Sequence, residues 1–324
     1  MLALTPGLAG AQEVSPPSAA GRQSLDDAWW TGPMLANTAA TAPAGHFLIE
    51  PYFYDVTGVG HYGSDGVRRS GPRSHGFGSQ SYVVYGLTDR VAVGLISAAG
   101  FNTVSGGPSS AGPGLGDVSL LAQYRLTQFH AGSWIPTTAV NLQETFPAGR
   151  YDRLGARPSD GFGSGAYTTM LSFYSQTCFW LPNGRVLRMR FNVSQAVSSS
   201  VRLEDGSIYG TGVGFRGHAK PGGSFAIDAS WEYSLTRSWV LASDLIYRHG
   251  GNTRVTGHDL LDPGMQNPSS IRLDSGSSDA FGVAPAIEYS WTPDLGVLLG
   301  VRVIAAGRNT AATITPALAI NYVH

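Results

Sequence analysis

The amino-acid sequence predicts an all-β fold, a closed antiparallel up-and-down transmembrane β-barrel of about 12 strands. Runs of roughly ten residues alternate apolar and polar side chains, as expected of strands with one lipid-facing and one water-facing side. The connections between these runs alternate in length, and tryptophans lie beside the short connections. Membrane barrels have short periplasmic turns and longer extracellular loops, whereas a β-sandwich gives no reason for this sorting.

The alternation is clearest in residues 225–235. Apolar side chains share one face there, and Ala226, Asp228, Ser230, Glu232 and Ser234 share the other. Because successive side chains alternate across a strand, one face can meet lipid while the other meets water. The same pattern predicts strands over 46–54, 79–85, 90–100, 114–125, 134–146, 166–180, 186–198, 223–235, 239–248, 278–291, 295–307 and 312–324.

The connections between these strands fall into two classes. The short ones are 86–89, 126–133, 181–185, 236–238 and 292–294, whereas the long ones are 55–78, 101–113, 147–165, 199–222 and 249–277, with 308–311 as an exception. Four tryptophans lie beside short connections: Trp134, Trp180, Trp239 and Trp291. Amphipathic rings favour the membrane–water boundary, so these four predict an aromatic membrane girdle at one rim, with ordinary core aromatics as the alternative.

Composition excludes several classes of protein. The chain has 324 residues, of which 43 are Gly and 13% are charged, and its net charge is −1, which gives no electrostatic reason to expect a nucleic-acid partner. The apolar stretch from Leu295 to Val301 stops at Arg302, well short of the roughly 20 residues of a spanning helix. One cysteine, Cys178, allows no intramolecular disulfide, and no Cys/His spacing suggests a metal site. We expect no cofactor.

Prolines fit the predicted strands poorly. Pro51, Pro136, Pro285 and Pro316 fall inside them. Because proline cannot donate a hydrogen bond to a sheet ladder, we expect these residues at bulges, strand ends or lost bonds.

The N-terminal part divides into two segments before the barrel. Residues 1–11 resemble the remnant of a secretory signal peptide, since Ala9-Gly10-Ala11 fits a small-x-small cleavage site; a disordered soluble N-terminus is the alternative. Residues 12–45 form a periplasmic or plug segment in this interpretation, and residues 46–324 form the barrel. A barrel with a secretory signal belongs in the outer membrane of a Gram-negative bacterium.

Several motifs resemble one protein family. They are Asp26-Asp27-Ala28-Trp29-Trp30-Thr31-Gly32-Pro33, Gly45-His46-Phe47-Leu48-Ile49-Glu50-Pro51-Tyr52, Tyr85-Gly86-Leu87-Thr88-Asp89-Arg90, Gly114-Leu115-Gly116-Asp117-Val118 and Pro147-Ala148-Gly149-Arg150-Tyr151-Asp152. Together they resemble the "MetA-pathway of phenol degradation" outer-membrane family, which is related to the long-chain fatty-acid channels. The resemblance covers roughly residues 26–324 and implies a barrel that passes small, often hydrophobic or aromatic, compounds. It does not imply an enzyme of phenol degradation.

Charged side chains on the water-facing phase are the candidate lumen-lining residues. They are Glu50, Arg125, Arg188, Arg190, Asp228, Glu232, Asp244, Arg248, Glu288 and Arg302. Two interpretations remain open: a network of ion pairs that stiffens the barrel, or a lining that selects solutes. A 12-strand bore can be closed by one inserted segment. We therefore hypothesise that residues 12–45, with Trp29 and Trp30, fold into the lumen as a plug, as the related channels' N-terminal hatch also implies; a loose periplasmic tail is the alternative.

Three functions compete on the sequence alone. The first is a porin-like channel for passive uptake of small, hydrophobic or aromatic molecules, and it needs no catalytic residue and no cofactor. The second is a hydrolase at the barrel rim, centred on the His258-Asp259 pair of the 249–277 loop, although no GxSxG or HExxH motif is present. The third is a structural barrel without an open pore. The partners expected are membrane lipid, small-molecule solutes and, during insertion, the barrel-assembly machinery.

Overall fold

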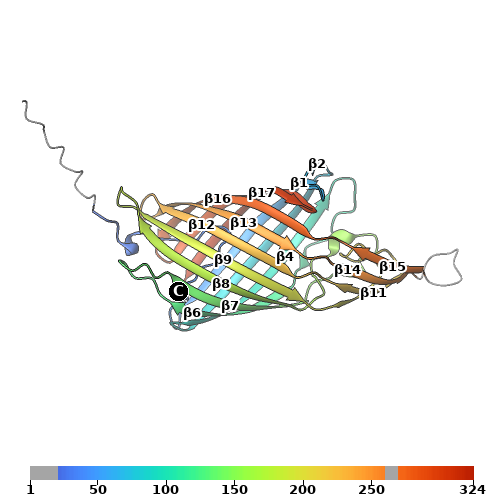
Figure 1. Ribbon diagram of the computed structural model, residues 1–324, viewed down its shortest axis with the longest axis horizontal. Coiled ribbons are helices and arrows are strands. Elements are labelled where there is room, and N and C mark those ends of the chain that lie inside the picture. The colour runs from blue at the N-terminus through green and yellow to red at the C-terminus, as the bar shows by residue number, and fades with distance from the viewer. Residues whose placement is uncertain (1–20, 260–268) are drawn as a thin grey trace, which may run out of the picture.

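The computed structural model describes residues 21–259 and 269–324. Within them, twelve long strands form one barrel wall (Figure 1). They are β1 (Phe47–Tyr62), β3 (Ser74–Thr88), β4 (Val91–Val104), β6 (Val118–Thr127), β7 (Thr137–Phe146), β8 (Thr168–Trp180), β9 (Val186–Ser198), β12 (Ser224–Ser234), β13 (Trp239–Gly250), β16 (Ser278–Thr292), β17 (Leu295–Arg308) and β18 (Thr310–Val323). No helix in these ranges is long and apolar enough to cross a membrane.

The wall closes on itself. Each long strand pairs antiparallel with its neighbour in the chain, and the last strand, β18, pairs with the first, β1, through partners such as Tyr52 and Ala319. Closure leaves no open sheet edge, which is the condition for a sheet to stand in hydrocarbon. The predicted fold class, a closed 12-strand antiparallel barrel, is confirmed.

The outward phase of the strands is apolar and exposed. Leu171, Phe173 and Leu299 are 60%, 41% and 56% exposed, and comparably exposed apolar side chains lie on every long strand except β12, where Ile227 and Trp231 are half-buried. A protein in water rarely exposes such a continuous apolar surface, so this belt is suited to contact with lipid. The short turns, at residues 89–90, 128–136, 181–185, 235–238 and 293–294, mark the periplasmic end, where the chain also terminates (Figure 1).

Four further strands form a second sheet beyond the opposite end of the barrel. They are β10 (Val201–Glu204), β11 (Phe215–Lys220), β14 (Arg254–Asp259) and β15 (Ser269–Asp274), and they pair in the order β10-β11-β14-β15. Two-residue strands, β2 (Arg68–Arg69) and β5 (Gly114–Leu115), and two short 3₁₀ helices, η1 (Leu25–Asp27) and η2 (Pro158–Asp160), complete the secondary structure. The sequence analysis predicted loops for the residues of this second sheet, because its strands are only four to six residues long.

The first two strands are longer than predicted. The prediction ended the first at residue 54 and began the second at 79, whereas β1 and β3 pair from Phe47 with Tyr85 to Gly58 with Ser74. Ser79 and Ser81 take outward positions that carry apolar side chains elsewhere in the strand, so the alternation is interrupted there, but the backbone ladder continues through them. The first extracellular loop is therefore 63–73 rather than 55–78.

The prolines lie where the ladder is already interrupted. Pro51 pairs with Ser81 of β3 but has no partner in β18, and Pro316 pairs with Val301 of β17 but has none in β1. Pro285 likewise pairs with β13 and not with β17. Pro136 lies before β7 rather than inside a strand. Each proline inside a strand thus lies where one of the strand's two hydrogen-bond ladders is interrupted. This is expected, because proline has no backbone N–H to donate.

Candidate functional site

The candidate site is the barrel lumen, into which the N-terminal segment inserts. Residues 30–43 of this segment, apart from Ala39, line a central cavity of about 810 Å³ together with inward side chains of the wall. The segment runs inside the barrel before the chain enters β1 at Phe47. The predicted signal remnant 1–11 and residues 12–20 lie outside the described residues.

The segment is anchored first at the periplasmic rim. The Trp180 indole N–H donates to the Gln23 carbonyl oxygen at 2.8 Å, and the Gln23 amide donates to the carbonyl of Gly184 at 2.9 Å. Asp27 forms an ion pair with Arg237, whose guanidinium lies 5.5 Å from the centre of the Trp29 ring. Two periplasmic turns therefore hold the segment where it enters the lumen.

A second anchor lies deeper and uses one carboxylate oxygen. Glu288 Oε2 accepts hydrogen bonds from the Thr31 amide at 2.8 Å, the Thr31 hydroxyl at 2.9 Å and the Gly32 amide at 3.1 Å. Glu288 is fully buried, and Thr31 is 9% exposed. Gly32 has φ +111°, a conformation that favours glycine. Thr31 and Glu288 are 257 positions apart in the sequence, so they come together only in the folded barrel.

A third anchor holds the inserted segment at Ala36 and Asn37. The Ala36 amide donates to Asp244 at 3.1 Å, while its carbonyl accepts from the Arg190 guanidinium at 2.8 Å. The Asn192 side chain donates to the Asn37 carbonyl at 3.0 Å. Because buried backbone polar groups need partners, these wall residues replace the water that the segment loses on entering.

Charged side chains of the wall also stabilise one another. Arg188 forms a two-point ion pair with Glu232, and Arg190 lies 3.1 Å from the same carboxylate. The Arg188 guanidinium lies 4.4 Å from the centre of the Trp30 ring, a cation–π geometry. The arginines thus neutralise a buried carboxylate and hold the inserted segment at the same time.

Apolar packing complements these polar anchors. Met34 is 7% exposed and packs in a cluster with small or apolar side chains of the last strands, namely Ala284, Leu298, Ala317 and Ala319. The wall leaves room for the segment by using glycine at Gly296, where an added Cβ would lie 2.1 Å from the Thr31 methyl carbon. The fit between segment and wall is therefore steric as well as polar.

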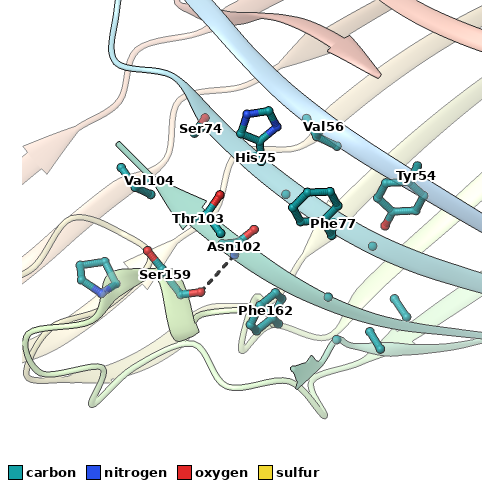
Figure 2. A pocket seen from close by; sticks show the side chains of 17 residues that line it. Tyr54, Val56, Ser74, His75, Phe77, Asn102, Thr103, Val104, Ser159 and Phe162 are labelled. Atoms are coloured by element: carbon teal, nitrogen blue, oxygen red, sulfur yellow. Dashed lines mark hydrogen bonds between the residues drawn. The ribbon is translucent and has the colours of Figure 1, made fainter. Parts of the chain in front are cut away.

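The wall of the central cavity is chemically mixed. Beside the inserted segment it carries apolar and aromatic side chains, among them Leu48, Tyr52, Tyr82, Ile96 and Met170, together with charged and amide side chains such as Arg190 and Gln123. A second cavity of about 550 Å³ lies toward the extracellular end and shares Tyr54, Val56 and Ala98 with the first (Figure 2).

The upper cavity is framed by aromatic rings and by one polar bridge. Figure 2 shows Phe77 and Phe162 on opposite sides of β4, and Asn102 donating to the Ser159 carbonyl oxygen of η2 at 3.0 Å. Glycine leaves room for the Phe162 ring, since an added Cβ at Gly114 would lie 2.2 Å from it. The loop 147–167 thus reaches into the extracellular mouth and narrows it.

The structure brings most of the predicted lumen-lining residues together. Four of them line the central cavity: Glu50, Arg188, Arg190 and Arg302. Asp228, Glu232, Asp244 and Glu288 are 7% exposed or less and contact arginines or the inserted segment, and Arg248 pairs with Asp228 at 2.8 Å. Arg125 shares a strand phase with Gln123 but does not line the cavity.

Neutral amides are the functional side chains that the sequence analysis missed. Gln123 donates to the Thr38 and Ala40 carbonyls at 3.2 Å each, and Asn321 donates to the Thr31 carbonyl at 3.3 Å. They lie on the inward phase like the charged residues, but the prediction of lumen residues rested on charge alone. The position of these amides on the inward phase was therefore the signal by which the sequence could have identified them.

The tryptophans divide into two groups. Trp239 and Trp291 are 42% and 54% exposed, lie on the outward phase and contact Tyr289 from either side, and Trp134 is 89% exposed at a periplasmic turn. Trp180 differs from the predicted girdle role, because its ring shares the inward phase of β8 and binds Gln23. The side chain that faces outward at this rim is Phe179, at 49% exposure.

His258 and Asp259 do not face each other. The two residues are adjacent in β14, so their side chains point to opposite faces of the extracellular sheet. Within residues 21–259 and 269–324, no group of three or more His, Cys, Asp or Glu side chains could hold a metal ion.

Comparison with known proteins identifies the family. The family model described as "Putative MetA-pathway of phenol degradation" matches residues 56–318. The chain belongs to this family. No curated protein sequence matches it. Among solved structures, this family member resembles the COG4313 outer membrane channel from Pseudomonas putida F1, with 15% identity, a TM-score of 0.66, and coverage of 90% of this chain and 100% of that one.

Two other solved barrels align less well. The NanC porin has 11% identity and a TM-score of 0.40, covering 85% of this chain and 98% of that one. The TodX monoaromatic hydrocarbon channel, as its deltaS2 mutant, has 11% identity and a TM-score of 0.37, covering 87% and 90%. The fold shared with the P. putida channel, the closed wall and the apolar belt make this family member a bacterial outer-membrane β-barrel.

Proposed function

We propose that this barrel is an outer-membrane channel for passive uptake of small hydrophobic or aromatic molecules. The observation that carries the proposal is the central cavity beside the inserted segment, whose wall combines apolar and aromatic side chains with charged and amide groups. Its volume of about 810 Å³ lies within the range of pockets that hold small molecules. Passage needs no chemical step in this proposal. The Pseudomonas putida barrel named above is an outer membrane channel, which agrees with the proposal.

Aromatic solutes suit this wall for a physical reason. The Tyr52 and Tyr82 rings meet edge to face, with centroids 6.0 Å apart, and both line the cavity. An aromatic guest can continue such edge-to-face contacts, and its transfer from water is favoured by the apolar surface that it covers. A sugar gains neither contribution and would need its hydroxyl groups satisfied.

We further propose that the inserted segment acts as a plug or gate, with Trp29 and Trp30 at its periplasmic half. Its anchors are hydrogen bonds and ion pairs that water can replace when the segment moves, so opening does not require the barrel wall to unfold. The remaining lumen-lining charges would then form the water-filled part of the path.

Uptake by intact Gram-negative cells that express the protein tests the channel. We expect accumulation of a labelled monocyclic aromatic above that of cells without the protein, and no gain for glucose. Tyr82→Ala should lower the aromatic uptake severalfold, because aromatic contacts contribute about 0.5–1.5 kcal/mol each. Tyr124→Ala, on the outward face at 45% exposure, is the matched control. Uptake equal to that of cells without the protein would refute the channel.

A further inference from the structure

The extracellular sheet continues the barrel wall. Its strand order, β10-β11-β14-β15, repeats the order β9-β12-β13-β16 of the barrel strands from which these four strands arise. Figure 1 shows the sheet projecting beyond the barrel along its long axis. The sheet is therefore a local upward extension of one side of the wall, outside the membrane.

One face of this sheet is apolar and covered. Val201, Leu203, Phe215, Ala219 and Val255 are at most 3% exposed, and Tyr151, Tyr209 and Ile271 pack against them. Tyr151 belongs to the loop 147–167, whose short helix η2 also contacts β4 on the other side of the mouth. The covered face therefore points toward the mouth, and the opposite face points away from the barrel axis.

The outer face is strongly basic. Residues that pair directly across an antiparallel sheet share a face, and the registers place one set together: Arg202, Arg216, Lys220, Arg254 and Arg272. All five are exposed, and Lys220 is the only lysine in the chain. His218 and His258 lie on the same face.

Two carboxylates on this face do not neutralise it. Glu204 is shared by Arg153, Arg202 and Arg216, and Asp274 is shared by Arg254 and Arg272. Hydrogen bonds from Arg153 and Arg216 hold the pKa of Glu204 below its usual range, and hydrogen bonds from Asn252, Arg272 and Arg254 hold the pKa of Asp274 below its usual range. Each arginine of the face uses one nitrogen in its ion pair, whereas a guanidinium carries five N–H donors.

We propose that this face, defined by Arg202, Arg216, Lys220, Arg254 and Arg272, binds the phosphate groups of lipopolysaccharide in the surrounding outer leaflet. Arginine forks match the geometry of phosphate, and a basic patch next to an anionic membrane surface attracts it. A solute entering the pore would not meet this basic face, because the face points away from the mouth. Lipopolysaccharide contacts would fix the barrel in its leaflet and brace the loops that shape the mouth.

Binding of lipopolysaccharide to the purified full chain in neutral detergent tests this proposal. Arg216→Gln with Arg272→Gln leaves each carboxylate at least one arginine. We expect this double variant to bind about 25-fold more weakly, since each basic residue at an anionic surface contributes roughly fivefold. Arg68→Gln with Arg73→Gln removes the same charge from another extracellular loop and should change binding less than twofold.

Dephosphorylated lipopolysaccharide separates phosphate recognition from sugar binding. We expect wild-type protein to bind it as weakly as the double variant binds the intact lipid. Acylation of Lys220 by an amine-reactive ester gives an independent readout on unmutated protein. The modification should be several times slower in membranes containing lipopolysaccharide than in detergent. Equal binding by the double variant and wild type, or equal labelling of Lys220 in both settings, would overturn the proposal.

Discussion

Removing the carboxylate that holds Thr31 and Gly32 should release the inserted segment. Glu288 Oε2 accepts three hydrogen bonds at 2.8, 2.9 and 3.1 Å, all from the segment. With about 1 kcal/mol for each bond, Glu288→Ala weakens the closed state by about 3 kcal/mol. This corresponds to an open-to-closed ratio about a hundredfold higher than in wild type.

Single-channel recording in planar bilayers measures this ratio as the frequency and duration of open events. Glu288→Gln keeps an acceptor oxygen in the same place, so its increase should be much smaller. Glu144→Ala removes a carboxylate that accepts its hydrogen bond from Thr169 rather than from the segment, and it should behave as wild type. Equal opening frequencies in Glu288→Ala and wild type would refute the role assigned to this anchor.

Three further predictions follow from the anchors and the extracellular sheet. Gly296→Ala places a methyl group 2.1 Å from a carbon of the segment and should raise ion conductance, whereas Gly112→Ala meets nothing within 4 Å and should not; equal conductance would contradict the steric fit. Trp180→Phe loses the hydrogen bond to the segment, so trypsin should cleave after Arg22 several times faster than in wild type; an unchanged rate would argue against this anchor. Because arginines lower the pKa of Glu204, its stabilising contribution is complete above the ordinary glutamate pKa and is lost as pH falls through the lowered value. Hydrogen-exchange protection factors in the extracellular sheet, which remove the pH dependence of the intrinsic rate, should therefore stay constant from pH 7 to about pH 5 and fall only in stronger acid; a fall near neutrality would contradict these ion pairs.

The barrel could be predicted because its signal is local. Period-two alternation defined β9 at residues 186–198 without any knowledge of its neighbours. Where serine replaces the outward apolar side chain, as at Ser79 and Ser81, the pattern fades although the ladder continues, and the strand was predicted too short. The extracellular sheet was missed for a related reason, since strands as short as Val201–Glu204 give too few alternations.

The site could be predicted only in part because its contacts are not local. The inward phase identified Glu288 and Asp244 as lumen residues, but nothing near them in sequence indicates Thr31 or Ala36 as partners. These contacts depend on the register of the closed wall. Trp180 shows the same limit, because its place beside a short turn suits both a membrane girdle and an anchor, and only strand phase separates the two.

Whether residues 22–43 close the pore is measured most directly by the conductance of the full chain against a chain lacking residues 12–40, in the same bilayer and salt. Both chains retain all twelve barrel strands, so a difference reports on the lumen alone. A small or intermittent conductance in the full chain and a large, steady one in the shortened chain is the expected result. The same conductance in both would contradict the plug.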